Sequence, residues 1–415
     1  LSNTYTYLPY EADQNYTGGD DETKGIWTPA CLEAKLPWDQ CNSNHIILGT
    51  LYPSTGYVEN MWKSYYKGIQ KANIYMANID RCTAMEEYER VWSKAEARAL
   101  RSIYYYNLFK LYGPFVNIGD EVFDVEGDVD AMMRERSSVD ECVNYMVDEF
   151  DAILAEGKLK SHFSDDGGGM NPQFAGNITK EALEAIRSEL LFYAASPLFN
   201  GNPDYADFVD KDGEHLFNSE YSVQKWVDAQ EACEQAIEIC EQGEGGISPD
   251  IVLHETHTNL VFSAKLKREL SLRECVTEKW NDELIWGLSG RLTGGLQQSC
   301  MSRVGKYPSN MHGASEKINP TMYATELYYT KNGVPIDEDK EWEYANRLKV
   351  KKNTNNTANE FYLIPDYETV SANFDREPRY YANIGFDGCL WYQNNCVSGN
   401  SSDIWQLKGR AGQAQ

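Results

Sequence analysis

The most restrictive feature of the sequence is a series of segments with helical periodicity between residues 61 and 243. Apolar residues recur there at steps of three and four, the spacing of one face of an α-helix. Most of the predicted helices are joined by short connections, and Ala, Cys and Ser recur where neighbouring helices would touch. Small residues let antiparallel helix pairs approach closely, so the pattern predicts stacked pairs of tetratricopeptide type, although the strict consensus is absent.

One predicted helix, residues 94–112, carries an unusual number of aromatic residues. The three tyrosines Tyr104–Tyr106 and the nearby Phe109 cannot all lie on one face of a helix. We therefore expect other segments to pack against this helix on more than one side, and we expect these rings to be core residues rather than ligand contacts. Gly113 is a typical C-terminal cap, and Pro114 blocks continuation of the helix.

Capping signals mark the next two predicted helices. Ser138 with Glu141 has the spacing of a capping box, and Gly157 is the expected stop of the same helix. Thr179 stands directly before the next helical pattern, where a side-chain oxygen accepts a hydrogen bond from a free backbone N–H.

The sequence predicts a mainly α fold with three parts. Residues 1–60 are expected to form an irregular N-terminal segment, and residues 61–243 a tetratricopeptide-like helical scaffold. Residues 244–415 are rich in Gly, Asn, Thr, Tyr and Trp, which is typical of a loop-rich region with short strands. No apolar run approaches the roughly 20 residues needed to span a bilayer as a helix.

The charge of the chain excludes some partners. Lys and Arg number 38 and Asp and Glu number 64, a formal net charge of −26. Such a surface repels phosphate backbones and anionic lipid head groups, so we expect no nucleic-acid partner and no direct binding to lipid head groups. The charge does not discriminate among neutral ligands.

Several patterns associated with metals, cofactors or catalysis are incomplete. The ten Cys include no CxxC pair, although disulfides between Cys31 and Cys41 or between Cys389 and Cys396 remain open. In the stretch HETH, His254 and His257 are spaced i,i+3, whereas the zinc-protease motif needs i,i+4. The stretch DKDGE, residues 210–214, does not complete a calcium loop and is expected to be a solvated turn. We therefore predict no metal, no cofactor and no enzymatic activity.

Six segments resemble, in the same order, hallmark segments of the SusD/RagB family of Bacteroidetes surface lipoproteins. They cover most of residues 55–390 and are WKSYYKGIQKANIYMANID, AEARALRSIYYYNLFKLYGPFVNI, RERSSVDECVNYMVDEFDAIL, ITKEALEAIRSELLFYAASP, INPTMYATELYYTKNGVPIDED and FDREPRYYANI. The last of these segments resembles the family's Arg-x-Pro-Arg stretch, which enters a strand. Both ends of the chain look incomplete beside the family pattern, so we expect them to lie within a longer protein.

The resemblance implies a function. Proteins of this kind sit on the outer face of the outer membrane, attached through an N-terminal lipid. They capture oligosaccharides for import by a partner SusC-like TonB-dependent transporter, and some relatives serve peptide uptake instead. A further alternative is a helical-repeat adaptor that binds only protein. In the first two cases we expect the loop-rich part to present the ligand site.

A sugar ring needs exposed aromatic platforms with hydrogen-bonding groups at their edges, and aromatic residues in loops are better candidates than those in periodic helices. Three loop-like segments meet this description. The alternative for the first is that its rings only attach an irregular segment to the scaffold, and for the second that Trp286 is buried. In the third segment Trp391, Tyr392 and Trp405 could instead be core residues of a strand pair. The predicted ligand-binding residues are Trp27, Trp38, Asp39, Asn42 and Tyr52 in the first segment, Trp286, Arg291 and Tyr307 in the second, and Trp391 in the third.

Overall fold

The structure is a computed structural model of the chain, and its described part comprises two compact units. The described residues are 1–9, 27–36, 42–124, 127, 130–161, 176–242, 251–256, 264–278, 280–288, 300, 318–392 and 404–409. Unit 1 is built from Leu1–Pro9, Gly56–Val252 and Leu284–Gly290, and unit 2 from Tyr10–Thr55, Leu253–Glu283 and Arg291–Gln415. Each unit therefore combines segments that are distant in sequence.

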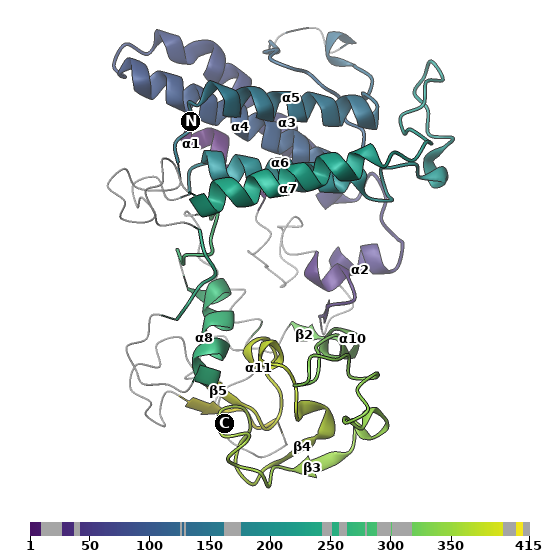
Figure 1. Cartoon of the computed structure of the whole chain (residues 1–415). Helices are drawn as coiled ribbons and strands as arrows, with labels where there is room; N and C mark the ends of the chain where they lie inside the picture. The colour runs from purple at the N-terminus through teal and green to yellow at the C-terminus, as the bar shows by residue number, and fades with distance from the viewer. Residues whose placement is uncertain are drawn as a thin grey trace. The chain divides into compact units, whose positions relative to one another are not determined.

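Unit 1 is a stack of α-helices. Its helices are α1 (Ser2–Tyr5), α3 (Gly56–Asn78), α4 (Glu87–Tyr112), α5 (Val139–Glu156), α6 (Lys180–Ala195) and α7 (Gln224–Gln242), with short 3-10 helices η2 (Ile79–Arg81), η3 (Asp130–Met132) and η4 (Pro203–Tyr205). Helix α3 packs along α4 and α6 along α7, while α5 contacts both α4 and α6 (Figure 1). The predicted stacked helix pairs are confirmed.

Helix α4 lies at the centre of this stack, which explains its aromatic content. Tyr104, Tyr105 and Phe109 are all fully buried. The ring of Tyr105 stacks on Phe115 with centroids 4.9 Å apart, and Phe109 stacks on Phe199 at 4.4 Å. Burial of each ring contributes on the order of 1.5–3 kcal/mol to stability. The prediction that these aromatics are core residues is confirmed.

A buried arginine adds a polar contact to the centre of unit 1. Arg101 of α4 donates to Asn73 Oδ1 at 3.0 Å and to Glu149 Oε2 at 2.6 Å, so it joins α3 to α5. Arg98, one turn earlier, forms a second ion pair with Glu149 at 2.8 Å. The two guanidinium groups together compensate the desolvation of the Glu149 carboxylate, which is the condition for burying a charge.

The predicted helix ends are confirmed by their hydrogen bonds. The Ser138 Oγ accepts from the Glu141 N–H at 3.3 Å, and the Glu141 carboxylate accepts from the Ser138 N–H at 2.8 Å. Thr179 Oγ1 caps α6 in the same way. Gly113 and Gly157 end α4 and α5 with φ of 67° and 61°, conformations that other residues adopt at a cost.

Unit 2 consists of short elements and long loops. Its helices are η1 (Thr28–Ala30), α2 (Asn42–Ile47), α8 (Ala264–Thr277), α10 (Met322–Glu326), η5 (Tyr344–Asn346), η6 (Ser371–Asn373) and α11 (Pro378–Asn383). Three antiparallel pairs are formed by β1 (Ala34–Lys35) with β2 (Asn319–Pro320), β3 (Val350–Lys352) with β4 (Glu368–Val370), and β5 (Leu390–Tyr392) with β6 (Ile404–Gln406). Short strands among loops agree with the prediction for this part of the chain.

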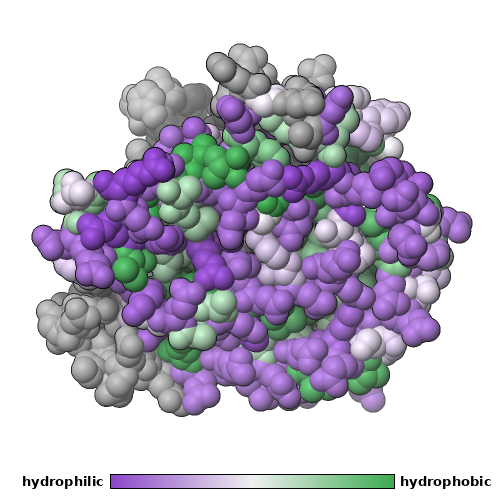
Figure 2. Space-filling view, turned by 90° about the horizontal axis from the view of Figure 1, so that it is seen from above, coloured by the Kyte–Doolittle hydropathy of each residue, from purple (hydrophilic) through white to green (hydrophobic). Residues whose placement is uncertain are grey.

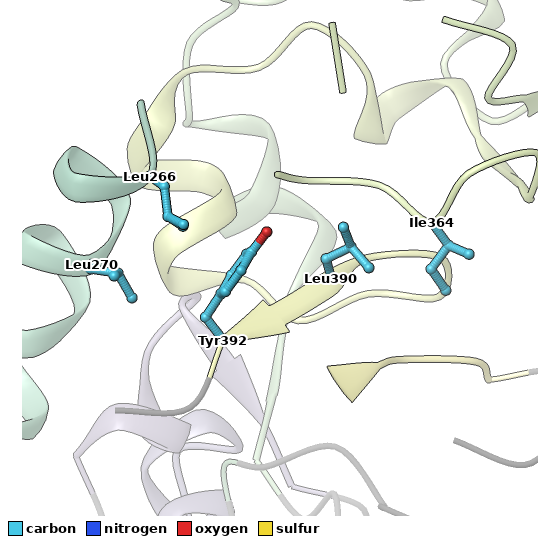
Figure 3. Close-up of a cluster of buried hydrophobic side chains, with 5 residues drawn as sticks. All are labelled: Leu266, Leu270, Ile364, Leu390 and Tyr392. Carbon is cyan, nitrogen blue, oxygen red and sulfur yellow. The ribbon is translucent and has the colours of Figure 1, made fainter. Parts of the chain in front are cut away.

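A small hydrophobic core joins α8 to strand β5. Leu266 and Leu270 project from successive turns of α8 toward the ring of Tyr392, and Leu390 and Ile364 lie on the other side of that ring (Figure 3). All of these side chains are buried. The core fixes the backbone of β5 against α8, so the side chains on the opposite face of β5 are held in a defined place.

Arg376 connects several segments of unit 2 through hydrogen bonds. Its guanidinium donates to the carbonyl oxygens of Thr325 at 2.6 Å, Tyr328 at 2.8 Å and Ala372 at 2.9 Å, and its side chain is buried. The chain that follows forms helix α11, which begins at Pro378. Arg376 itself forms an isolated antiparallel bridge with Thr330, but the expected strand does not continue, because Pro378 fits the first turn of a helix, where no N–H bond is lost.

The outer surface agrees with the composition. The face shown in Figure 2 is predominantly hydrophilic, with hydrophobic residues in small separate groups. Among the described helices, none combines the length and the apolar character needed to cross a membrane. Cys389 is a free buried thiol, and burial raises its pKa to about 12. Cys396, its possible partner in the sequence, lies outside the described residues.

Candidate functional site

The first predicted loop segment belongs to unit 2. Trp27 is half-buried directly before the 3-10 helix η1, and Tyr52 has a relative exposure of 63%. Tyr52 therefore offers an open ring, whereas only part of Trp27 is accessible. Asn42 begins α2, but its side chain lies outside the described part, as do Trp38 and Asp39.

The second predicted segment contributes one described aromatic residue. Trp286 is half-buried, and its indole N–H donates to the carbonyl oxygen of Gly176 at 3.1 Å. This bond occupies the polar edge of the indole inside unit 1 and anchors the segment Leu284–Gly290 there. Arg291 and Tyr307, predicted in the same loop, lie outside the described residues.

The third segment places two tryptophans opposite each other in a strand pair. Trp391 of β5 is the direct partner of Trp405 of β6 in the antiparallel register. Directly opposite residues project from the same face of a sheet, with Cβ atoms about 4.5–5.5 Å apart. Leu390 and Tyr392 point to the other face, into the core of Figure 3. Both indoles are half-buried, so each keeps part of its surface accessible.

The ring of Trp391 is supported by a buried arginine. The Cζ atom of Arg273, on α8, lies 3.8 Å from the centroid of the Trp391 ring. The same guanidinium donates to the carbonyl oxygens of Tyr392 at 2.9 Å, Tyr381 at 3.1 Å and Ala382 at 3.0 Å. These bonds fix the guanidinium plane, so one face of the indole rests on a rigid cation. The orientation of Trp391 is therefore set by the fold.

The counter-ion of Arg273 is also buried. Glu269 Oε1 accepts from Arg273 at 3.1 Å, one helical turn away. Burial raises the pKa of Glu269 and lowers the pKa of Arg273, because a site without water disfavours both charged forms. With both side chains enclosed, the pair is suited to holding the indole in place and has no surface on which to act as an acid or base toward a ligand.

A groove between α5, α6 and α7 of unit 1 is a second candidate surface. It has a volume of about 440 Å³, and its walls carry charged side chains and one apolar strip that includes Leu191. Its cations are ion-paired: Lys225 with Asp140 at 2.6 Å, and Arg187 with Asp151 at 2.6 Å. Sequence reasoning missed this groove because its residues resemble the solvated faces of ordinary amphipathic helices.

The structure thus distributes the predicted ligand-binding residues over both units. Trp27, Tyr52 and Trp391 belong to unit 2, while Trp286 belongs to unit 1. Trp405 stands beside Trp391 in the third predicted segment, and the strand pair that the sequence left open there is formed in the structure.

Comparison with family models finds two matches. Residues 13–154 match a SusD-like model described as "Starch-binding associating with outer membrane", and residues 282–414 match the model of the SusD family. Comparison with curated proteins gives no match.

Solved structures with the same fold come from SusD-like proteins. A protein named BT4246 superposes with a TM-score of 0.71 at 20% identity, over 94% of this chain and 64% of its own length. A SusD-like protein (BF3747) from Bacteroides fragilis NCTC 9343 has a TM-score of 0.61 at 17% identity, over 98% and 62%. A SusD-like carbohydrate binding protein (BF0978) from the same strain reaches 0.50 at 17% identity, over 85% and 60%.

The chain therefore spans less than two thirds of the length of these solved structures. The first match contains the first three of the six hallmark segments, and the second match contains the last two. The mainly α architecture with tetratricopeptide-like helix pairs is also that of the SusD-like structures. The chain belongs to the SusD/RagB family.

Proposed function

We propose that the protein is a cell-surface glycan-binding lipoprotein, which captures oligosaccharides for import by a partner SusC-like TonB-dependent transporter. Family membership supports the class, because the matching model is described as starch-binding and associated with the outer membrane. A solved structure with the same fold is described as a carbohydrate binding protein. In this proposal the protein binds and delivers its ligand and has no catalytic step.

The observation that carries the proposal is the pairing of Trp391 with Trp405. The apolar C–H face of a sugar packs on an aromatic ring, and two half-buried indoles at paired strand positions offer such a ring to more than one sugar unit. Rigid aromatic platforms lose little conformational entropy on binding, and Arg273 already holds the first indole in place.

Polar residues stand next to this pair in the sequence. Asn394 and Asn395 follow β5 and Asp403 precedes β6, and all three lie outside the described residues. Side chains of these types supply the hydrogen bonds that orient sugar hydroxyl groups. We include them in the proposed site together with the tryptophan pair.

Calorimetric titration against a panel of oligosaccharides and oligopeptides tests this function. The variants Trp391→Ala and Trp405→Ala are compared with Trp38→Ala and Trp286→Ala from the other predicted segments. Tyr88→Ala serves as the matched control, because Tyr88 is an aromatic residue of α4 with 66% exposure in unit 1.

We expect an oligosaccharide to bind and its affinity to fall in Trp391→Ala and Trp405→Ala but not in Tyr88→Ala. Loss in Trp38→Ala or Trp286→Ala alone would keep the glycan function and move the site to another predicted segment. Binding of peptides alone would support the alternative of a RagB-like peptide-uptake protein. Capture of a tagged full-length protein from detergent-extracted outer membranes, with no transporter recovered, would contradict the proposed partner.

A further inference from the structure

A histidine and two glutamates converge on one point of unit 2. His254 lies in the segment before α8, Glu274 lies on the last turns of α8, and Glu278 follows directly after the helix. The N–H of Glu278 donates to the carbonyl of Glu274 at 2.8 Å, so the helical geometry continues and both carboxylates share one face. The ligand-type atoms of all three residues lie within 4.8 Å of one another.

Two of the three distances match the edges of a small tetrahedral site. His254 Nε2 is 3.5 Å from Glu274 Oε2 and 3.2 Å from Glu278 Oε2. Zinc binds imidazole nitrogen and carboxylate oxygen at about 2.0–2.2 Å, and tetrahedral angles then separate two ligand atoms by about 3.3–3.6 Å. The third distance, between the two carboxylates, lies within 4.8 Å, and the partly exposed Glu278 can move to close it around an ion.

The arrangement fits a cation better than a shared proton. A protonated imidazole has a single N–H at Nε2, which can point well at only one carboxylate. Here two carboxylate oxygens approach the same nitrogen, and the side chains of His254 and Glu274 are buried, with exposures of 0% and 4%. The buried Glu274 carboxylate and the neighbouring, partly exposed Glu278 carboxylate repel each other, and a doubly charged ion removes that repulsion.

Neighbouring hydrogen bonds hold the histidine segment against α8. The Glu283 carboxylate accepts from the backbone N–H of His254 at 3.1 Å, and Glu283 is itself fixed through its N–H to Asn281 Oδ1 at 3.0 Å. Two residues after the histidine, the N–H of Thr256 donates to Ser271 Oγ at 3.0 Å. Such outer contacts orient metal ligands before the metal arrives.

We propose that His254, Glu274 and Glu278 bind a zinc ion or a similar divalent transition metal, with water in the fourth position. An imidazole ligand favours zinc over calcium and magnesium, which prefer oxygen ligands and higher coordination numbers. Glu278 has an exposure of 43%, so it connects the site to solvent and provides the entry path. The metal would staple the segment before α8 to the end of that helix.

This site differs from the zinc-protease motif that the sequence excluded. His257, the second histidine of HETH, lies outside the described residues and is not needed. The helix that follows supplies the two carboxylates instead, from positions 20 and 24 residues after His254. No spacing rule for local motifs would find ligands so arranged.

Metal binding to the chelator-stripped protein tests the proposal. Zn²⁺ is titrated in competition with a chromogenic chelator, and Co²⁺ is titrated separately because tetrahedral Co²⁺ absorbs visible light far more strongly than octahedral Co²⁺. The variants are His254→Ala, Glu274→Gln and Glu278→Gln, with His215→Ala as the control for an exposed histidine. Glu278→Gln tests the site with the least disturbance of the fold, because its side chain is the most exposed of the three ligands. Circular dichroism checks the fold of each variant.

We expect one Zn²⁺ per chain, a tetrahedral Co²⁺ spectrum, and at least about a tenfold loss of affinity in Glu278→Gln, with none in His215→Ala. Thermal unfolding of the wild-type protein should shift upward with Zn²⁺, because the ion binds only the folded state. Binding that is equal in wild type and Glu278→Gln, an octahedral Co²⁺ spectrum, or no binding would each overturn the proposal.

Discussion

Replacing Glu96 by Gln should remove a pH dependence of stability that resides in unit 1. Glu96 is a fully buried residue of α4. Its carboxylate accepts a hydrogen bond from the hydroxyl of Tyr5 in α1, and that hydroxyl accepts from the backbone N–H of Ile178 at 2.9 Å. Burial raises the pKa of Glu96 from its ordinary 4.5 to about 7, and the hydrogen bond from Tyr5 opposes this shift only in part.

The sign and size of the effect follow from proton linkage. A carboxyl group with a higher pKa in the folded state binds protons more tightly there than in the unfolded chain. Its contribution to stability is fully present below pH 4.5 and is lost as the pH rises through about 7. Each pKa unit corresponds to about 1.4 kcal/mol, so the folded state should lose on the order of 3 kcal/mol between pH 4 and pH 8 from this group.

Urea unfolding at pH 5 and pH 8, followed by circular dichroism, measures this loss. Gln keeps the size and the acceptor oxygen of Glu but does not titrate in this range. The stability of Glu96→Gln relative to wild type should therefore increase by about 2–3 kcal/mol from pH 5 to pH 8. Glu87→Gln is the control, because Glu87 is an exposed residue of the same helix.

A relative stability that does not change between the two pH values would refute this reasoning. It would mean that Glu96 carries the same charge throughout and that burial does not govern its ionisation. An equal pH-dependent change in Glu87→Gln would show that the effect reflects the overall negative charge of the chain.

Three other substitutions test the packing. Gly68→Ala should destabilise unit 1 by about 1–3 kcal/mol in urea unfolding, because a Cβ atom at this position would lie 2.7 Å from the Tyr104 ring; an unchanged midpoint would show that the ring can move aside. Ser138→Ala should lower the free energy of unfolding by about 1 kcal/mol, because it removes the side-chain cap of α5. Ser138→Thr keeps a hydroxyl and should retain most of that stability in the same urea unfolding experiment. Arg376→Lys should destabilise unit 2 by several kcal/mol, because a single ammonium nitrogen cannot donate hydrogen bonds to all the carbonyl oxygens that the two guanidinium nitrogens reach. A near-normal melting temperature would contradict this.

The elements of unit 1 were predictable because their signals are local. Helical periodicity extends over several turns in each long helix, and the capping box at Ser138 lies within four residues. The aromatic run of α4 also indicated correctly that neighbours cover more than one side of the helix. Interactions between residues a few positions apart leave a pattern that can be read along the chain.

The pairings of unit 2 were not predictable for the opposite reason. Ala34 pairs with Pro320, and the strands β1 and β2 contain only two residues each, too few for an alternating pattern. Helix α11 was expected to be a strand entry because of the family resemblance, and its six residues are too few to show a helical period that would have corrected this. Its helical state depends on packing against α8, which is distant in sequence.

The candidate sites show the same division. Tryptophan in a loop is visible in the sequence, but the pairing of Trp391 with Trp405 and the support from Arg273 come from three separate segments. Nothing in the sequence near His254, Glu274 or Glu278 marks any of them as a metal ligand. Only the fold brings the three side chains together.

By itself, the sequence determined the family, the helical character of residues 61–243, the ends of the main helices and the strongly negative charge. Each of these features depends on residue types and on spacings within a few helical turns, so it does not depend on how distant segments pack. Tertiary structure alone decided which aromatic rings are buried, which tryptophans stand together and which carboxylates face a histidine. These outcomes depend on contacts between distant segments, because burial and charge neighbours are properties of a packed chain.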